Sequence, residues 1–292
     1  MKLLLTFLLL FFTKISLAFN FESKPINVIM PFGAGGGVDQ TFRHFEKYLS
    51  NQNIKMIPVY KPGANGVVAG NEIFTAPSDG YTIYIGTAST IAEWESKNPN
   101  KKLTSVTLMR NPTMSVISSK FKNLEELESA IKNSKPILLG YTSPDQIRLF
   151  NEIVSRVNSN YRPEVIPYKA VPQMLQDLVG NSIDLSLVPM SVSKSIIDAK
   201  KVNLVAHDYD TDLSGYNAAV LPKHYKNWTR FGGFSLALPP NVNQEIVKSW
   251  LNIFTAYAND PGTVKDWRQD LMISLPLGKQ ALEEQIKLAI EK

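Results

Sequence analysis

The sequence contains no cysteine and only three histidines, and both shortages narrow its chemistry. Without cysteine, the chain has no disulfides, thiol nucleophiles or thiolate metal sites, and it cannot carry a lipid as a lipoprotein does. In an oxidising compartment the fold would then depend on its apolar core, which a chain of this length can build. His44, His207 and His224 are far apart and lack carboxylates at a matching spacing. We therefore expect no metal site and no histidine base.

Dense basic tracts and common catalytic motifs are also missing. The formal net charge is +5, and two of the positive charges, Lys2 and Lys14, lie in the N-terminal segment. This mild charge, without a run of lysine or arginine, argues against a nucleic-acid partner. The G-x-S-x-G motif of a nucleophile elbow does not occur. We therefore predict a binding protein rather than an enzyme, with no catalytic residue and no cofactor.

One long apolar run is present, at the N-terminus. Lys2 precedes an almost unbroken apolar stretch from Leu3 to Phe12, and Ser16 and Ala18 are small residues where a signal peptidase reads. We interpret residues 1–18 as a secretory signal peptide, which predicts a periplasmic protein. The alternative is a membrane anchor, which is disfavoured because the run has about half the roughly 20 residues of a spanning helix.

Beyond residue 18, strand-like and helix-like patterns alternate along most of the chain. Strand patterns include residues 27–30, 55–60, 82–86, 137–140, 164–167 and 183–188. Such alternation predicts an α/β fold of mostly parallel sheets flanked by helices. Two segments, 103–118 and 215–235, resemble crossings between domains. We therefore expect a discontinuous lobe 1 at residues 19–110 and 230–292, and a lobe 2 at residues 111–229.

The segment from Pro31 to Asp39, Pro-Phe-Gly-Ala-Gly-Gly-Gly-Val-Asp, connects a strand pattern to a helical pattern. A glycine-rich turn at a helix start exposes backbone N–H groups at the positive end of the helix dipole, which binds anions without a cationic side chain. Nucleotide binding is disfavoured, because no lysine follows the glycines and Val38 stands at the third glycine of a dinucleotide fingerprint. A tight turn with a purely structural role is the alternative.

Small and hydroxyl residues follow other strand patterns, at the sheet edge where ligands bind in open α/β folds. Residues 86–90 read Gly-Thr-Ala-Ser-Thr, and residues 140–143 read Gly-Tyr-Thr-Ser. Their hydroxyls can donate to an anion, although a solvated loop with a helix cap explains them too. Asp184 opens a further strand, where a structural role is an equal alternative. Taken alone, the turn at residues 60–66 is a plain connection between strand and helix.

Several of these motifs occur in the order and spacing of a known family. Residues 25–39, 61–66, 76–82 and 86–87 resemble the N-terminal half of the tripartite tricarboxylate transporter substrate-binding proteins, the TctC or Bug family. Residues 165–169, 175–185, 260–261 and the helix after Leu277-Gly278 are similar to the middle and tail of that family. The resemblance spans most of residues 25–290.

The resemblance implies a type II periplasmic binding protein, in which two α/β lobes joined by two crossings close on a small carboxylate. It places the carboxylate-binding loop at residues 32–37 and the other ligand contacts on loops of both lobes. The ligand-binding residues expected on this basis are Phe32, Gly33, Ala34, Gly35, Gly36, Gly37, Thr87, Ser89, Thr90, Tyr141, Thr142, Ser143, Tyr168, Lys169 and Asp184.

The sequence departs from the family pattern at two places. Position 170 is alanine where the family usually has glycine, so the approach of the backbone to the ligand is expected to differ. Residues 91–102 are shorter and more polar than the usual family loop, and they include Glu93 and Glu95. We expect this segment to border the cleft as a loop and to influence which ligand is bound.

Together, these features predict a monomeric periplasmic solute-binding protein. It would capture a small carboxylate and deliver it to the membrane permease subunits of a tripartite tricarboxylate transporter. One alternative is a protein of the same fold that reports ligand occupancy to a membrane sensor without transport. Another is an exported enzyme on the same scaffold, which would need a nucleophile and a base together in the cleft.

Overall fold

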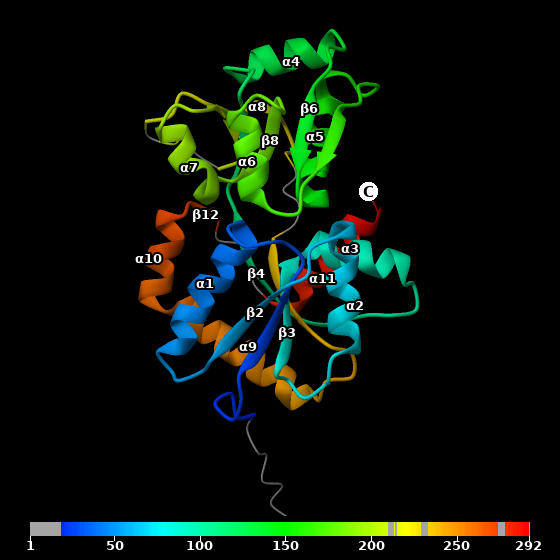
Figure 1. The fold of residues 1–292 in the computed structure, drawn as a ribbon, viewed down its shortest axis with the longest axis vertical. Helices are drawn as coiled ribbons and strands as arrows, with labels where there is room; N and C mark the ends of the chain where they lie inside the picture. Colours follow the sequence, from blue (N-terminus) through cyan, green and yellow to red (C-terminus); the bar gives the residue numbers. More distant parts are fainter. Residues whose placement is uncertain (1–18, 210–212, 214, 229–232, 274–277, 292) are drawn as a thin grey trace, which may run out of the picture.

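The computed structural model describes residues 19–209, 213, 215–228, 233–273 and 278–291. The expected signal peptide at residues 1–18 lies outside this part of the chain, as does Leu277. Within the described residues, no helix combines the length and the apolar character needed to span a membrane. Two sheets with their helices are stacked along the long axis of the molecule (Figure 1) and are termed lobe 1 and lobe 2 here.

Lobe 1 is built on a six-stranded sheet of order β12-β4-β11-β3-β1-β2. The strands are β1 (Ile26–Met30), β2 (Met56–Tyr60), β3 (Thr82–Thr87), β4 (Thr104–Pro112), β11 (Phe234–Leu238) and β12 (Met272–Ile273). The helices are α1 (Gly37–Ser50), α2 (Val67–Thr75), α3 (Ala88–Lys97), α9 (Gln244–Asn259), α10 (Pro261–Gln269) and α11 (Lys279–Glu291), with a short 3-10 helix at Ala64–Gly66.

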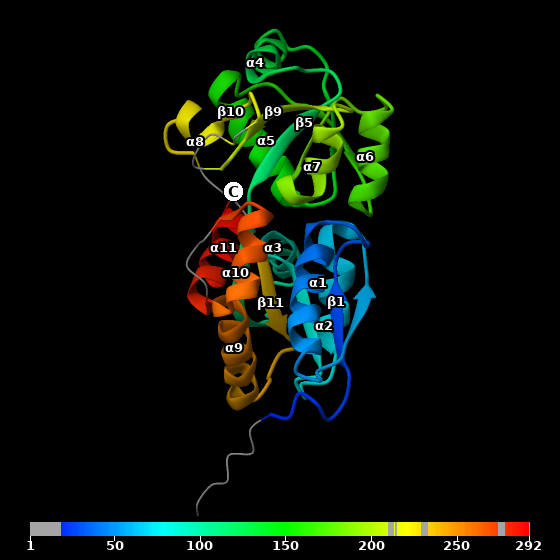
Figure 2. The same cartoon turned by 90° about the vertical axis from the view of Figure 1, so that its left-hand side faces the viewer.

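Lobe 2 is built on a second six-stranded sheet, of order β10-β9-β5-β8-β6-β7. The strands are β5 (Met114–Ser118), β6 (Leu138–Tyr141), β7 (Glu164–Pro167), β8 (Leu185–Pro189), β9 (Asn203–His207) and β10 (Ala219–Val220). The helices are α4 (Leu124–Lys132), α5 (Pro144–Val157), α6 (Val171–Val179), α7 (Met190–Asp198) and α8 (Leu221–His224). Figure 2 shows α6 and α7 facing the upper ends of α1 and α10 across the junction of the lobes.

Strand β1 shows why the lobe 1 sheet is buried on both faces. Its side chains alternate between two core clusters: Val28 and Met30 pack with Phe45 of α1, while Ile29 packs with Ile73 of α2. Successive side chains of a strand point to opposite faces of the sheet, so a run of apolar residues supplies both clusters. The uninterrupted apolar pattern of this strand therefore places helices on both sides of the sheet.

Both sheets are mixed in direction. β1 is parallel to β2 and β3, whereas β11 is antiparallel to β3 and β4. In lobe 2, β6 is parallel to β7 and β8, whereas β5 is antiparallel to β8 and β9. The reversed strands are those that enter from the other lobe, because a crossover helix fixes the parallel direction only within one sheet. The two-lobed α/β fold is confirmed.

The chain passes between the lobes at two places. It leaves lobe 1 at Thr113, between β4 and β5, and the backbone N–H of Thr113 donates to the Leu271 carbonyl oxygen at 3.3 Å. It returns between α8 and β11, through a stretch that includes residues 229–232, which lie outside the described chain. The expected lobe bounds at residues 110 and 230 stay a prediction.

The segment at residues 91–102 differs from the loop expected at the cleft. Helix α3 continues to Lys97, and Trp94 is fully buried, with its indole Nε1 donating to Asn71 Oδ1 at 2.9 Å. Glu93 pairs with Lys97 at 2.8 Å along the helix. The segment is therefore largely helical rather than the expected loop, and neither glutamate is among the residues that line the cavity between the lobes.

Candidate functional site

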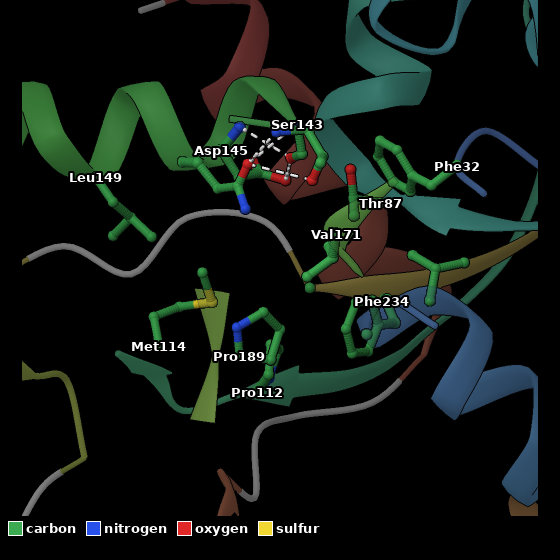
Figure 3. A pocket seen from close by; sticks show the side chains of 16 residues that line it. Phe32, Thr87, Pro112, Met114, Ser143, Asp145, Leu149, Val171, Pro189 and Phe234 are labelled. Atoms are coloured by element: carbon green, nitrogen blue, oxygen red, sulfur yellow. Dashed lines mark hydrogen bonds between the residues drawn. The ribbon is translucent and has the colours of Figure 1, made fainter. Parts of the chain in front are cut away.

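Strands from both lobes end at the junction between them and enclose a cavity of about 60 Å³ (Figure 3). Apolar side chains form most of its wall, and polar groups gather at one end beside Ser143 and Asp145. The residues that line it are Phe32, Gly36, Gly37, Val38, Thr87, Pro112, Met114, Thr142, Ser143, Asp145, Gln146, Leu149, Val171, Pro189, Gly233 and Phe234.

The starts of several helices converge on this cavity. The N-cap residues of α1, α3, α5 and α7 are Gly36, Thr87, Ser143 and Pro189, and all four line it. Val171, the first residue of α6, joins them. Each helix start carries a partial positive charge, so their convergence favours an anion.

The residues of the glycine loop before α1 fall into two groups: some have backbone amides that are bonded within the protein, and others line the cavity. Gly33 N donates to the Lys169 carbonyl oxygen at 3.0 Å, and Gly35 N donates to Asp39 Oδ2 at 2.9 Å. Gly36, Gly37 and Val38 line the cavity, while Ala34 is exposed. Gly33 and Gly35 therefore use their amides within the protein, and the residues of the run from Phe32 to Gly37 that line the cavity are Phe32, Gly36 and Gly37.

The same glycines allow the lobes to touch. A Cβ atom at Gly33 would lie 2.8 Å from Ala170 Cβ, and one at Gly36 would lie 3.2 Å from Val171 Cγ2. A Cβ at Gly37 would meet Pro189 Cγ at 2.8 Å. The absence of side chains thus lets the α1 loop of lobe 1 pack directly on lobe 2.

The hydroxyls at residues 87–90 have separate roles. Thr87 lines the cavity, and its side chain accepts a hydrogen bond from Thr90 N at 3.3 Å as the cap of α3. Thr90 Oγ1 lies 2.5 Å from Tyr84 Oη in the core and donates to the Thr87 carbonyl oxygen at 2.8 Å. Ser89 reaches across to lobe 2 and donates to Asp145. Thr90 therefore supports the loop rather than facing the cavity.

The matching turn of lobe 2 is held by its own helix. Thr142 N and Ser143 N donate to Gln146 Oε1 at 2.5 Å and 3.0 Å, and Ser143 caps α5. Both residues are buried and both line the cavity. The sequence Ser-Pro-Asp-Gln therefore builds a rigid helix start beside the ligand space.

A second cavity of about 220 Å³ lies beside the first, and Phe32 and Thr142 line both. It brings together Tyr141, Tyr168 and Lys169 with the turn at residues 62–66. Tyr168 Oη donates to Asp177 Oδ2 at 2.7 Å. Burial and this neighbouring carboxylate raise the pKa of Tyr168 to about 12. The turn at residues 60–66, which the sequence alone presented as a plain connection, thus forms one wall of the junction between the lobes.

Asp184 does not join the other expected site residues. It precedes β8, where its carboxylate accepts from Leu138 N at 3.0 Å and pairs with Lys120 Nζ at 3.1 Å. Leu138 is the first residue of β6, so Asp184 lies at the opposite end of the sheet from the cavity. A carboxylate that opens a strand cannot reach a site built on strand carboxyl ends, and the structural role holds.

Asp145 is the charged residue of the cavity that sequence reasoning missed. It follows the Tyr-Thr-Ser motif in the first turn of α5, and its side chain is buried. Its carboxylate accepts from Ser89 and, at 3.2 Å, from Ser143 Oγ. An acidic residue just after a hydroxyl-rich strand end was the available signal. From the sequence alone, this residue is interpreted as an acid that stabilises the positive end of the helix dipole. Only the arrangement of the two lobes shows that it lines the cavity.

Burial raises the pKa of the Asp145 carboxyl above its ordinary value, because desolvation penalises the charged form. The guanidinium of Arg148 and hydroxyl donors, including Ser143, oppose that shift. Among the described residues, no group of three or more histidines, aspartates or glutamates is placed to hold a metal ion. The chemistry this site offers is hydrogen bonding and charge pairing.

A family model described as the tripartite tricarboxylate transporter family receptor, TctC, matches residues 43–282. The chain belongs to the TctC receptor family. This confirms the family resemblance inferred from the glycine loop and the later motifs. The family is one of periplasmic receptors that bind substrates, rather than one of enzymes.

Relatives of this chain occur in Pseudomonas and Bordetella. A UPF0065 protein from Pseudomonas sp. strain P51 is 25% identical over 194 residues, which covers 62% of this chain and 57% of that protein. A UPF0065 protein from Bordetella pertussis is 30% identical over 193 residues, which covers 62% of this chain and 59% of that protein. The chain therefore spans somewhat over half the length of the curated relatives it matches.

Solved TctC-type structures share the fold. The periplasmic binding protein BugD superposes with a TM-score of 0.78 at 19% identity, covering 92% of this chain and 95% of BugD. An R. palustris protein with adipate gives 0.78 at 19%, covering 93% and 95%. MatC from Rhodopseudomonas palustris with bound malate gives 0.77 at 16%, covering 93% and 99%. These similarities establish the two-lobed periplasmic binding protein architecture.

Proposed function

We propose that this TctC protein is a periplasmic receptor that closes its two lobes on a small carboxylate. The observation that carries the proposal is the convergence of the α1, α3, α5 and α7 starts on one cavity between the lobes. Helix starts from opposite lobes can hold one anion between them, and closure then brings both sets of donors to it. The proposed ligand contacts are Phe32, Gly36, Gly37, Thr87, Thr142 and Ser143.

The bound acid would be passed to a membrane permease of the tripartite tricarboxylate type. The family match supports this partner, and the structures of relatives with adipate and malate support an acid as the ligand. A charge-assisted hydrogen bond contributes about 1.5–3 kcal/mol, so two or three backbone donors suffice for firm binding of one carboxylate. Closure of the lobes would be the state that the permease recognises.

Ligand binding is tested by thermal unfolding and calorimetry with mono-, di- and tricarboxylates. A true ligand at a hundredfold excess over its dissociation constant stabilises the folded protein by about 2.7 kcal/mol, which gives a clear rise in melting temperature. The matched control is the amide of each acid, which keeps the carbon chain and removes the charge. A response to the amide equal to that of the acid, or no response to any acid, would overturn the proposal.

The permease partner is tested separately, by uptake of the labelled acid into cells. Deletion of the gene should abolish uptake, and the wild-type gene should restore it. Uptake that persists without the gene, while the purified protein still binds the acid, would favour the sensor alternative over transport.

A further inference from the structure

Asp145 gives the cavity a negative charge of its own. Among the described residues that line the cavity, it is the one with an ionisable side chain, and it is only 7% exposed. Figure 3 shows its carboxyl group beside Ser143, close to Thr87, at the polar end of the cavity. The carboxylate of Asp145 repels the carboxylate of a ligand. The ligand must therefore place its negative charge far from Asp145 or offer Asp145 a positively charged group.

The hydrogen bonds of Asp145 come from neutral groups on both lobes. Ser89 of lobe 1 and Ser143 of lobe 2 donate hydroxyls to it. Hydroxyls stabilise a carboxylate without cancelling its charge, and burial still raises the pKa of this carboxyl. Together with the Thr87 hydroxyl, these donors still leave a lone pair free, because a carboxylate accepts about four hydrogen bonds. The residue therefore retains capacity for a further donor, and a positive one fits best.

Arg148 is the cation nearest to Asp145 on its own helix; one of its amino groups is bonded elsewhere, and its Nη1 is buried without a hydrogen-bond partner in the described part of the chain. Its Nη2 donates to the carbonyl oxygen of Ala289 on α11 at 2.6 Å, and its side chain does not line the cavity. The guanidinium charge lowers the cost of the buried carboxylate. It does not occupy the side of Asp145 that faces the ligand space.

The two ends of the cavity thus have opposite preferences. At one end, the cavity is lined by the start of α1, at Gly36, Gly37 and Val38. Among the described residues that line this end, none is acidic. At the other end, Asp145 accepts from the Ser89 and Ser143 hydroxyls at the starts of α3 and α5, so a second ligand carboxylate there would meet a like charge in a dry space. A dicarboxylate fits this arrangement poorly.

We propose that the cavity takes a small zwitterion with one carboxylate and one ammonium group, and that Asp145 is the specificity-determining residue that binds the ammonium. The carboxylate would lie at the start of α1. The inference rests on the proposed function and narrows its ligand class. One water needs about 10–15 Å³ of such space, so a cavity of about 60 Å³ suits a short amino acid.

The test is a matched set of three-carbon acids measured by calorimetry on the wild-type protein. The set is propanoate, alanine, 3-aminopropanoate, lactate and malonate. At least one of the two amino acids should bind at least tenfold more tightly than propanoate, and malonate should bind no better than propanoate. Lactate separates charge from hydrogen bonding, because it carries a hydroxyl in place of the ammonium.

The variant Asp145→Asn keeps the shape of the side chain and removes its charge. It should reduce the preference for the amino acid to under threefold and improve malonate binding at least fivefold. Asp198→Asn is the control, since Asp198 is an exposed acid on α7 of the same lobe, paired with Lys194. It should leave every ratio unchanged, and circular dichroism should verify that both variants fold.

Several outcomes would overturn the inference while sparing the proposed function. These are equal binding of propanoate and both amino acids, lactate binding as tightly as the preferred amino acid, or an amino-acid preference that survives in Asp145→Asn. If Asp145→Asn does not fold, the relative affinities of the wild-type protein for the three-carbon acids are sufficient to test the inference. If the protein bound none of the three-carbon acids and none of the mono-, di- and tricarboxylates of the wider screen, that result would instead overturn the proposed function.

Discussion

At the residue scale, the absence of a side chain at Gly33 allows the two lobes to approach closely. Gly33 N donates to the Lys169 carbonyl oxygen, and the next residue, Ala170, fills the space where a Cβ at position 33 would lie. Position 170 is where the family resemblance predicts glycine, and this chain has alanine there. The departure therefore makes the lobe contact tighter, and it does so at the rim of the ligand space.

The variant Gly33→Ala should hold the lobes apart. The introduced Cβ would lie 2.8 Å from Ala170 Cβ, and neither atom is the end of a flexible side chain. We expect ligand affinity to fall at least tenfold and the radius of gyration with ligand, measured by small-angle scattering, to exceed that of the wild type. Adding Ala170→Gly removes the opposing methyl and should restore most of the affinity. A single variant that binds normally would contradict this account of closure.

Asp145 should make stability depend on pH in a definite direction. Its pKa is raised in the folded protein, so between the unfolded value of about 3.9 and the folded value the native state binds more protons than the unfolded state. Stability contributed by this group is therefore lost as pH rises through that window. The stability of Asp145→Asn relative to wild type should accordingly increase between pH 4 and pH 7.

The measurement is urea unfolding of both proteins, without ligand, at several pH values. The difference between the two curves isolates the titration of Asp145, because Arg148 keeps its charge throughout this range. A difference that is flat, or that falls with pH, would show that the carboxyl is not held in an unfavourable charged state.

At the scale of elements, helix α3 links the core to the cleft. Its first turn carries Thr87 and Ser89 to the junction, while Trp94 anchors its middle against Gly70 and Phe74 of α2. The helix is thus rigid where it meets the ligand space. Glu93 and Lys97 pair with each other further along the helix, and neither lines the cavity.

The variant Gly70→Ala tests this anchor. A Cβ at Gly70 would lie 2.4 Å from Cγ and Cδ1 of the buried Trp94 ring. Overpacking of this kind typically costs 1–3 kcal/mol, which exceeds the roughly 1 kcal/mol that alanine gains over glycine in a helix. Denaturant unfolding should show a net loss. Val68→Ala, at an exposed position of the same helix, should change stability by less than about 0.5 kcal/mol.

At the scale of the whole molecule, the lobes are joined by polar contacts around the cavity. Ser191 of α7 donates to Gln40 Oε1 of α1 at 2.8 Å, and Arg148 donates to the Ala289 carbonyl oxygen of α11. Each bond exists only where the lobes meet. Such contacts stabilise the closed form and so add to apparent ligand affinity without touching the ligand.

Removing the bond between Ser191 and Gln40 should weaken ligand binding through closure alone. A hydrogen bond contributes about 0.5–1.5 kcal/mol net, so Ser191→Ala should raise the dissociation constant by roughly two- to tenfold. Gln40→Ala should do the same, and the double variant should be no weaker than either single one. Ser249→Ala, which removes a surface hydroxyl on α9, is the control. Additive losses would show that the two residues act independently.

The parts of the fold that follow local patterns could be predicted. The expected strand at residues 164–167 is β7, and those at residues 27–30 and 82–86 are β1 and β3 within one residue at their ends. The hydroxyls Thr87 and Ser143 were also recognisable, because a cap after a strand end is a local signal. Helix α3 was missed because its polar surface obscured the spacing of Ile91 and Trp94.

The site as a whole could not be predicted to the same depth. Asp145 and Asp184 are both acids beside strands, and only the sheet shows that one faces the cavity while the other lies at the far end. The strand order and the reversal of β5 and β11 depend on where the chain crosses between lobes. Pairing of this kind is set by contacts between distant residues, which leave no local pattern.

Residue types and their short-range spacing were sufficient to predict the alternating strands and helices, the glycine-rich helix start and the family. Tertiary structure decided which helix starts share a cavity, which glycine amides are already bonded, and that a buried carboxylate stands among them. The physical reason is that closure brings together groups from two lobes. Their charges and shapes act on one another only at distances that folding creates.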